Sequence, residues 1–179
     1  MAATRNSLDK GSDLDDCHTH LDQYPMEDID GILSRAREAG VTRIVTAGTT
    51  LESSLTCIKL ADRFPGIFAA IGIHPMDIKE PWSDRVAHKL KGMASLTKRL
   101  VAISEIGLDF QPGMPDRDLQ RIYLSQQIRI ALELKLPIIY HSREAYPNIL
   151  DLLEDEGAPT VGGIAHYFQG DQDTAERCV

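Results

Sequence analysis

Short apolar runs alternate with longer amphipathic segments along this 179-residue chain, and this alternation constrains the fold more than any other feature. The runs are rich in aliphatic and β-branched residues, as expected for strands that are buried on both faces. Between them, apolar residues recur at helical spacing, as Ile29, Leu33 and Ala36 do before Gly40. Because each helical segment returns the chain to the start of the next strand, the pattern predicts a parallel sheet.

Six such strand–helix units are predicted, each of roughly 25–30 residues. The predicted strands are 14–18, 42–47, 67–73, 100–104, 137–140 and 160–165. The predicted helices are 27–39, 51–64, 83–97, 116–134, 143–156 and one that begins near 171, with Ser83 as a candidate cap.

The fold class that fits this order is α/β, namely a TIM-type (β/α) barrel. A closed barrel of this type needs eight strands, so the chain supplies about six of eight units and is expected to be truncated at its C-terminal end. An open, doubly wound sheet is the alternative. However, neither Gly-x-Gly-x-x-Gly nor Gly-x-x-x-x-Gly-Lys-Ser/Thr follows any predicted strand, so no nucleotide-binding motif supports it.

Metal-binding residue types end five of the six runs. Because the carboxyl ends of parallel strands meet at one rim of a barrel, these side chains are expected to converge there. Five of the six histidines occupy such positions, and the pattern therefore predicts a metal site at the rim. The strand-end residues are His18, His20, His74, Glu105, His141 and His166.

The pair His18 and His20 is the sharpest local feature. Residues two apart in a strand project to the same face, so both imidazoles can reach one cation. A ligand imidazole is usually oriented by a carboxylate or carbonyl on its second nitrogen, and Asp16 or Asp22 is available for this. Taken alone, the pair is equally compatible with two histidines that hydrogen-bond the backbone at a strand exit.

Glu105 follows the fourth predicted strand and is expected to point into the barrel mouth. Its two carboxylate oxygens can bridge two cations about 3.5–4 Å apart, as in two-metal hydrolases. The alternative is an ion-pair partner at a loop entrance. His141 and His166, at the ends of the next two strands, make a second cation site plausible.

His74 and Arg143 are candidate substrate contacts. His74 lies in a Gly-x-His-Pro turn and is predicted to contact substrate or donate a proton, with a purely structural turn histidine as the alternative. Arg143 can pair with a phosphate through two N–H groups, or equally be a solvent-facing arginine at a helix start.

Composition narrows the class of protein. The net charge of −8 argues against a broad phosphate-binding surface. Three widely spaced cysteines without a Cys-x-x-Cys pair fit a reducing cytoplasm, and no apolar stretch reaches the roughly 18 residues of a membrane span. Residues 1–12 are expected to be a flexible N-terminal tail, and 13–179 a single, incomplete (β/α) barrel with a metal site.

Several motifs in this order and spacing resemble the TatD-like family of metal-dependent nucleases, within the amidohydrolase-like barrel group. The resemblance runs from about Leu14 to the end of the chain. Its motifs are Asp-x-His-x-His-Leu-Asp at 16–22, Gly-Ile-His-Pro at 72–75, Glu-Ile-Gly-Leu-Asp at 105–109, the paired-glutamine region at 120–126, His-Ser-Arg at 141–143, and an altered His-Cys-Phe-Ser-Gly at 166–170.

The resemblance implies a (β/α)₈ barrel that holds two divalent cations (Mg, Mn or Zn) and hydrolyses phosphodiester bonds of DNA as an exonuclease acting on single strands or ends. It implies that His18 and His20 hold one cation, that Glu105 bridges, and that His141 and His166 hold the other. Glu105 and His74 are then the catalytic residues, and His74 and Arg143 contact the substrate. No membrane partner is implied.

One family element has no counterpart in these residues. The family's last metal-site aspartate, in a Thr-Asp-Ala/Ser-Pro element after the eighth strand, is absent, and the seventh and eighth strands are absent with it. Three hypotheses follow: a metal-dependent deoxyribonuclease, a barrel metallohydrolase acting on a small ester, amide or aminoacyl substrate, and an inactive fragment. The missing strands predict open sheet edges and poor stability of the 179-residue chain alone.

Overall fold

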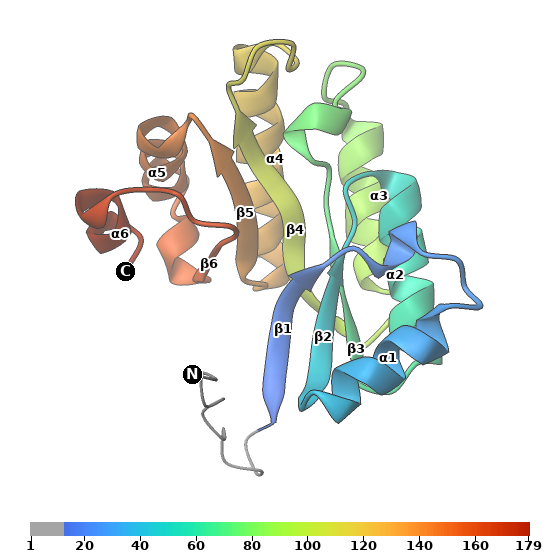
Figure 1. Cartoon of the computed structure of the whole chain (residues 1–179). Coiled ribbons are helices and arrows are strands. Elements are labelled where there is room, and N and C mark those ends of the chain that lie inside the picture. Colours follow the sequence, from blue (N-terminus) through green and yellow to red (C-terminus); the bar gives the residue numbers. More distant parts are fainter. Residues whose placement is uncertain (1–12) are drawn as a thin grey trace, which may run out of the picture.

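The computed structural model of the chain describes residues 13–179, so the predicted tail at 1–12 lies outside the described residues. It contains one six-stranded sheet in which the strands follow each other in sequence order and every neighbouring pair is parallel (Figure 1). This arrangement confirms the predicted parallel sheet. The strands are β1 (Leu14–Thr19), β2 (Val41–Ala47), β3 (Ile67–Ile71), β4 (Leu100–Asp109), β5 (Ile138–Arg143) and β6 (Gly163–Ala165).

A helix follows each strand, and helices α2 to α5 lie along the outer side of the curved sheet (Figure 1). None of the helices in residues 13–179 is long and apolar enough to cross a membrane. The α-helices are α1 (Ile29–Glu38), α2 (Leu51–Arg63), α3 (Asp84–Ala94), α4 (Arg117–Leu134), α5 (Tyr146–Asp155) and α6 (Gln172–Arg177), and the short 3₁₀ turns are η1 (Leu21–Gln23), η2 (Pro75–Asp77) and η3 (Ala158–Thr160).

Side-chain caps fix the starts of three of these helices, α2, α4 and α6, the last through Asp171. Thr50 and Ser53 form a reciprocal capping box at α2, and the Asp116 carboxylate accepts the backbone N–H groups of residues 118 and 119, both at 3.0 Å, at α4. Ser83 occupies the N-cap position of α3, as predicted, but its side chain makes no capping hydrogen bond.

Two strands run further than the sequence predicts. β4 continues to Asp109 and β5 to Arg143, so the predicted strand ends at 104 and 140 and the predicted helix start at 143 are wrong. The two strands stay paired through Gly107–His141 and Asp109–Arg143. The reason is steric: a Cβ on Gly107 would lie 2.0 Å from the His141 carbonyl oxygen, so glycine permits the close approach of the two backbones.

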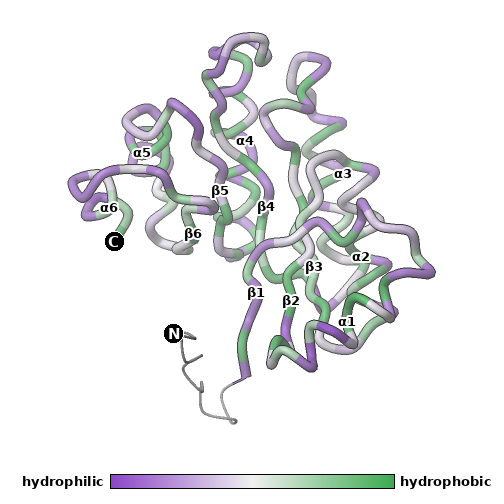
Figure 2. The backbone as a smooth tube through the Cα atoms, viewed as in Figure 1, coloured by the Kyte–Doolittle hydropathy of each residue, from purple (hydrophilic) through white to green (hydrophobic). Residues whose placement is uncertain are grey.

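Helices pack against the outer face of the sheet, and the main hydrophobic core lies between the two. Figure 2 shows hydrophobic residues concentrated along the central strands. On the inner face a smaller cluster joins Ala47, Ala70, Ala102 and Ile139. The largest fully buried side chains, mostly between sheet and helices, are Ile29, Leu60, Ile67, Ile71, Leu90, Ile103, Ile106, Leu108, Leu124, Ile128, Ile138 and Ile149.

The first and last strands are the edges of this sheet. β1 pairs only with β2, and β6 pairs only with β5 through three residues, so the described residues form a curved, open part of a barrel. Apolar side chains on these edges remain partly exposed, with Leu14 at 40% and Ile164 at 42%. The carboxyl ends of the strands nevertheless converge, and they position the site.

Candidate metal centre

The six strand-end residues predicted from the sequence come together at the carboxyl rim. His18 lies in β1 and His20 directly after it, His141 lies in β5, and His166 follows β6. Glu105, within β4, is 4% exposed and occupies the middle of the cluster. His74 joins it from the turn after β3.

Glu105 presents one carboxylate oxygen to each of two histidine groups. Its Oε2 lies 3.3 Å from Nε2 of His18 and 3.3 Å from Nε2 of His20. Its Oε1 lies 3.3 Å from Nδ1 of His141 and 3.6 Å from Nε2 of His74. Burial alone raises the pKa of Glu105, but hydrogen bonds from His141, His18 and His20 outweigh it and hold the pKa well below its usual range. The carboxylate is therefore ionised.

The Oε2 side contains three imidazoles. His20 donates Nδ1–H to the Ala47 carbonyl oxygen at 2.8 Å, because a carbonyl can only accept, and Nε2 then points at the cluster. The His166 ring stacks on His18 with ring centroids 3.6 Å apart. His18, Glu105 and His166 each offer one ligand atom, all within 4.8 Å of one another. The family resemblance pairs His166 with His141, whereas the structure groups it with His18.

The Oε1 side is organised by Asp109, the last residue of β4. Its fully buried carboxylate lies 3.1 Å from Nε2 of His141 and can accept a hydrogen bond from it, while Nδ1 of the same ring faces Glu105. A carboxylate behind a histidine is the usual way in which a ligand imidazole is oriented and made more basic. Arg143 extends beside it, with Nη1 3.7 Å from Asp109 Oδ2.

His74 differs from His141 in the ring nitrogen that it turns towards Glu105, which is Nε2 in His74 and Nδ1 in His141. Its Nδ1 accepts the backbone N–H of Met76 at 3.1 Å, so a neutral His74 ring carries its proton on Nε2, the nitrogen that faces Glu105. Burial lowers the pKa of His74 to about 4, which favours this neutral form. His74, Glu105 and His141 also lie close enough to hold an ion, but the bond to Met76 makes His74 a hydrogen-bond donor rather than a ligand.

The donor set fits divalent cations. Imidazole nitrogens and a shared carboxylate suit Zn and Mn, and the carboxylate also suits Mg. Among the described residues, Nδ1 of His18 is buried without a hydrogen-bond partner. A buried nitrogen of this kind costs free energy, so the cluster is not satisfied as a hydrogen-bond network of its own.

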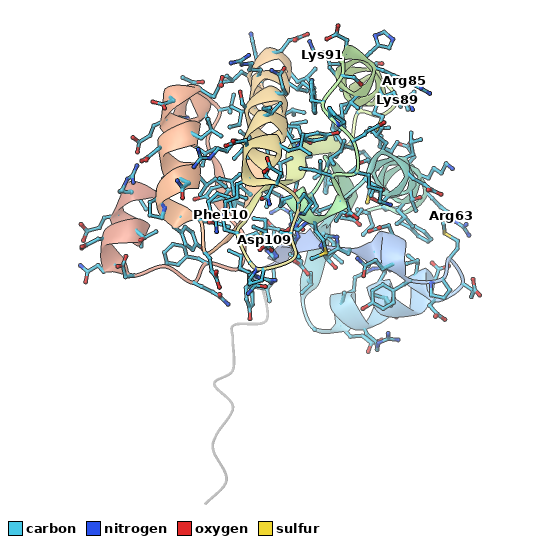
Figure 3. The ribbon with its side chains drawn as sticks, turned by 90° about the horizontal axis from the view of Figure 1, so that it is seen from above. Arg63, Arg85, Lys89, Lys91, Asp109 and Phe110 are labelled. Carbon is cyan, nitrogen blue, oxygen red and sulfur yellow. The ribbon has the colours of Figure 1, made fainter. Side chains whose placement is uncertain are left out.

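A cavity of about 340 Å³ opens over the centre. Arg143 and Tyr167 lie on its wall, and Tyr167 is 70% exposed. Seen from above in Figure 3, Asp109 and Phe110 lie towards the middle of the molecule. The labelled basic side chains sit on the outer helices, namely Arg63 on α2 and Arg85, Lys89 and Lys91 on α3. The cavity is lined by His20, His74, Met76, Glu105, His141, Ser142, Arg143, His166, Tyr167 and Gln169.

Sequence reasoning missed the groups that orient the histidines. Asp16 and Asp22 were the predicted partners, but Asp16 accepts the backbone N–H of His18, and Asp22 contacts the Cys57 thiol. The Ala47 carbonyl and the Asp109 carboxylate have this role instead. The sequence does contain an indication of Asp109. It lies four residues after Glu105 in the same strand, and residues at this spacing project to the same face of a sheet.

A partial (β/α) barrel with a buried glutamate between strand-end histidines defines a metal-dependent hydrolase type of site. Residues 15–179 match the profile of the family described as TatD related DNase. The chain belongs to this family, as the motifs indicated.

Relatives agree with this assignment. The chain is 35% identical, over 93% of its length, to an uncharacterized metal-dependent hydrolase, YabD, from Bacillus subtilis. It is also 35% identical, over 85% of its length, to a 3'-5' ssDNA/RNA exonuclease TatD from Cronobacter turicensis. The crystal structure of YJJV, a TatD homologue from Escherichia coli, superposes over 92% of this chain with a TM-score of 0.84 and 31% identity. The predicted barrel-type fold is thus confirmed.

The relatives are longer than this chain. The matched region spans 65% of YabD, 57% of the Cronobacter exonuclease and 63% of the YJJV chain. The six strands therefore correspond to less than two thirds of each of these proteins.

Proposed function

We propose that this protein is a metal-dependent hydrolase that cleaves phosphodiester bonds of single-stranded nucleic acid, DNA above all, from its ends. The observation that carries the proposal is the division of the Glu105 oxygens between two histidine groups. This is the arrangement needed to hold two cations side by side. The name of the Cronobacter relative, a 3'-5' ssDNA/RNA exonuclease, supports the substrate class.

Two bound divalent cations would supply Lewis acidity and an activated water for attack on phosphorus. Glu105 would contribute a negative charge shared between them, with His18, His20 and His166 on one side and His141 on the other. His74 keeps a proton on Nε2 towards the cluster and would donate it to a phosphate oxygen or the leaving group. Arg143, on the cavity wall, would pair with a phosphate.

Charge and shape favour recognition of a short stretch of nucleic acid. The chain carries a net charge of −8, and the labelled basic residues of α2 and α3 lie away from the central strand ends (Figure 3). Binding is then confined to the cavity, where Tyr167 offers an exposed ring for a base to stack on. All three cysteines are free in the described residues, and we place the activity in the reducing cytoplasm.

The test is a nuclease assay on single-stranded DNA labelled at either end. We expect progressive shortening from one end with Mn²⁺, loss with EDTA, and recovery when Mn²⁺ is restored. Glu105→Gln should be inactive, and His88→Ala, at an exposed position of α3, should match the parent chain. Metal-dependent hydrolysis of a carboxylic ester without nucleotide release would overturn the proposal in favour of a small-ester hydrolase. No metal-dependent hydrolysis at all would also overturn it for this chain.

A further inference from the structure

Two buried glutamines of α4 hold the backbone of the site. Gln127, 1% exposed, accepts the N–H of Ile73 on Oε1 at 2.7 Å and donates from Nε2 to the Ile73 carbonyl at 3.1 Å. The amide thus pairs with one residue as a neighbouring strand would. Ile73 directly precedes His74, so this contact fixes the backbone from which the His74 ring projects.

Gln120 makes the same contact at the end of β4. It is fully buried, accepts the N–H of Asp109 on Oε1 at 2.8 Å, and donates from Nε2 to the carbonyl oxygens of Asp109 and Pro115, each at 2.8 Å. Asp109 is the residue whose carboxylate holds His141. The backbone contact therefore sets the position of that carboxylate.

The two glutamines share a face of α4 because they are seven residues apart, close to two helical turns. Pairing between β3 and β4 ends at Ile71 and Ile103, before the chain reaches Ile73 and Asp109, the two residues that the glutamines bind. Beyond this point the backbone groups of these strand ends would lose their partners, and buried unpaired groups are costly. The side-chain amides of Gln120 and Gln127 supply the backbone hydrogen bonds that strand pairing no longer provides.

We infer that Gln120 and Gln127 are positioning residues through which α4 sets two parts of the centre separately: His141 by way of Asp109, and His74 by way of Ile73. The sequence resemblance singled out the region 120–126. Gln126, however, is only half-buried, and its side chain has no hydrogen bond within the described part of the chain. The structure assigns the second position to Gln127.

The two contacts have different consequences. Loss of the Gln120 contact frees Asp109 from its position and so disturbs a cation ligand, His141; changes at such supporting groups weaken cation binding by about 10–100-fold. Loss of the Gln127 contact displaces His74, which is not a ligand, so turnover should fall by about tenfold or more while cation affinity is kept. The turnover part of this inference rests on the proposed function.

The experiment compares Gln120→Met and Gln127→Met, which keep the side-chain length but lose the hydrogen bonds, with Gln126→Met as the matched control. Mn²⁺ affinity is measured by calorimetry on the full chain, and turnover on a base-free phosphodiester. In the metal-free chain, NMR follows the ring protons of His141 and His74. We expect weaker Mn²⁺ binding and a changed His141 signal only for Gln120→Met. Slower turnover at unchanged affinity and a changed His74 signal are expected only for Gln127→Met.

Overturning results are equally specific. If both variants match Gln126→Met in affinity, turnover and ring signals, or both lose only thermal stability, the glutamines are structural and the inference is wrong. Should a methionine variant not fold, Gln120→Glu or Gln127→Glu, which keeps a carbonyl acceptor, takes its place in the same comparison. If the parent chain hydrolyses no phosphodiester, the proposed function fails, and the NMR and calorimetric results alone decide the positioning roles.

Discussion

Glu105 is a buried carboxylate that four histidines surround, and this environment explains its role. Burying a charge costs free energy unless the charge is paired. Here the cost is offset by imidazoles on both oxygens, and these hydrogen bonds hold the pKa of Glu105 low despite its burial. His74 is different, because its proton stays on the nitrogen that faces the cluster. Replacing Glu105 and replacing His74 should therefore lower kcat by different factors.

Replacing Glu105 with Gln should lower kcat by more than about 10³-fold, because the shared negative charge between two cations is lost. His74→Asn should cost about 10²-fold, the range for a lost proton donor. Both are measured by steady-state kinetics at saturating Mn²⁺. Equal losses for the two variants would contradict a bridging role for Glu105.

Tyr167 should contribute to substrate binding and not to chemistry. Tyr167→Ala is expected to raise KM for single-stranded DNA by about tenfold, in line with the loss of one stacked base, while Tyr167→Phe stays near the parent value. The control substrate is a base-free phosphodiester, for which the two variants should not differ. A KM for DNA that is unchanged in Tyr167→Ala would show that no base stacks on this ring.

The sequence predicts the residues of the centre better than it predicts their supports. His18, Glu105 and His141 could be named because strand ends converge in a parallel barrel, whatever the side-chain details. Asp109 and Gln127 could not, because their roles depend on which backbone group or ring nitrogen they reach in three dimensions. Tautomers, too, depend on such contacts.

At the scale of elements, the pairing of β4 with β5 sets Gly107 opposite His141 and Asp109 opposite Arg143, and so brings the Asp109 carboxylate close to the His141 ring. The six strands and their helices were predictable from periodicity. The length of β4 was not, because Gly107 reads as a turn residue in sequence but serves a close approach of two strands in the structure. The start of α5 was misplaced for the same reason, since β5 stays paired up to Arg143.

Gly107→Ala tests this pairing. Its Cβ would lie 2.0 Å from the His141 carbonyl, so the strands must separate, and we expect a loss of about 1–3 kcal/mol in unfolding free energy with weaker Mn²⁺ binding. The control is Gly92→Ala in α3, where a Cβ meets nothing within 4 Å and alanine should stabilise the helix by about 0.5–1 kcal/mol. Urea denaturation measures both. Equal stability of the two variants would refute the close approach.

At the scale of the whole molecule, the sheet is a partial barrel with two open edges, β1 and β6, in residues 13–179. Exposed strand edges favour association with other chains. Fusing the part of the YabD relative that follows its matched region after residue 179 should raise Tm by at least about 5 °C and reduce aggregation. Calorimetry and light scattering compare the two proteins. A cooperative, monomeric melt of the 179-residue chain at the same Tm would show that six units suffice.

The central claim is that Glu105 bridges two cations, and anomalous X-ray scattering from a crystal soaked in Mn²⁺ tests it most directly. We predict two peaks about 3.5–4 Å apart. One should lie on the Oε2 side with His18, and the other on the Oε1 side with His141, with His74 touching neither. A single peak, or peaks that avoid Glu105, would contradict the account.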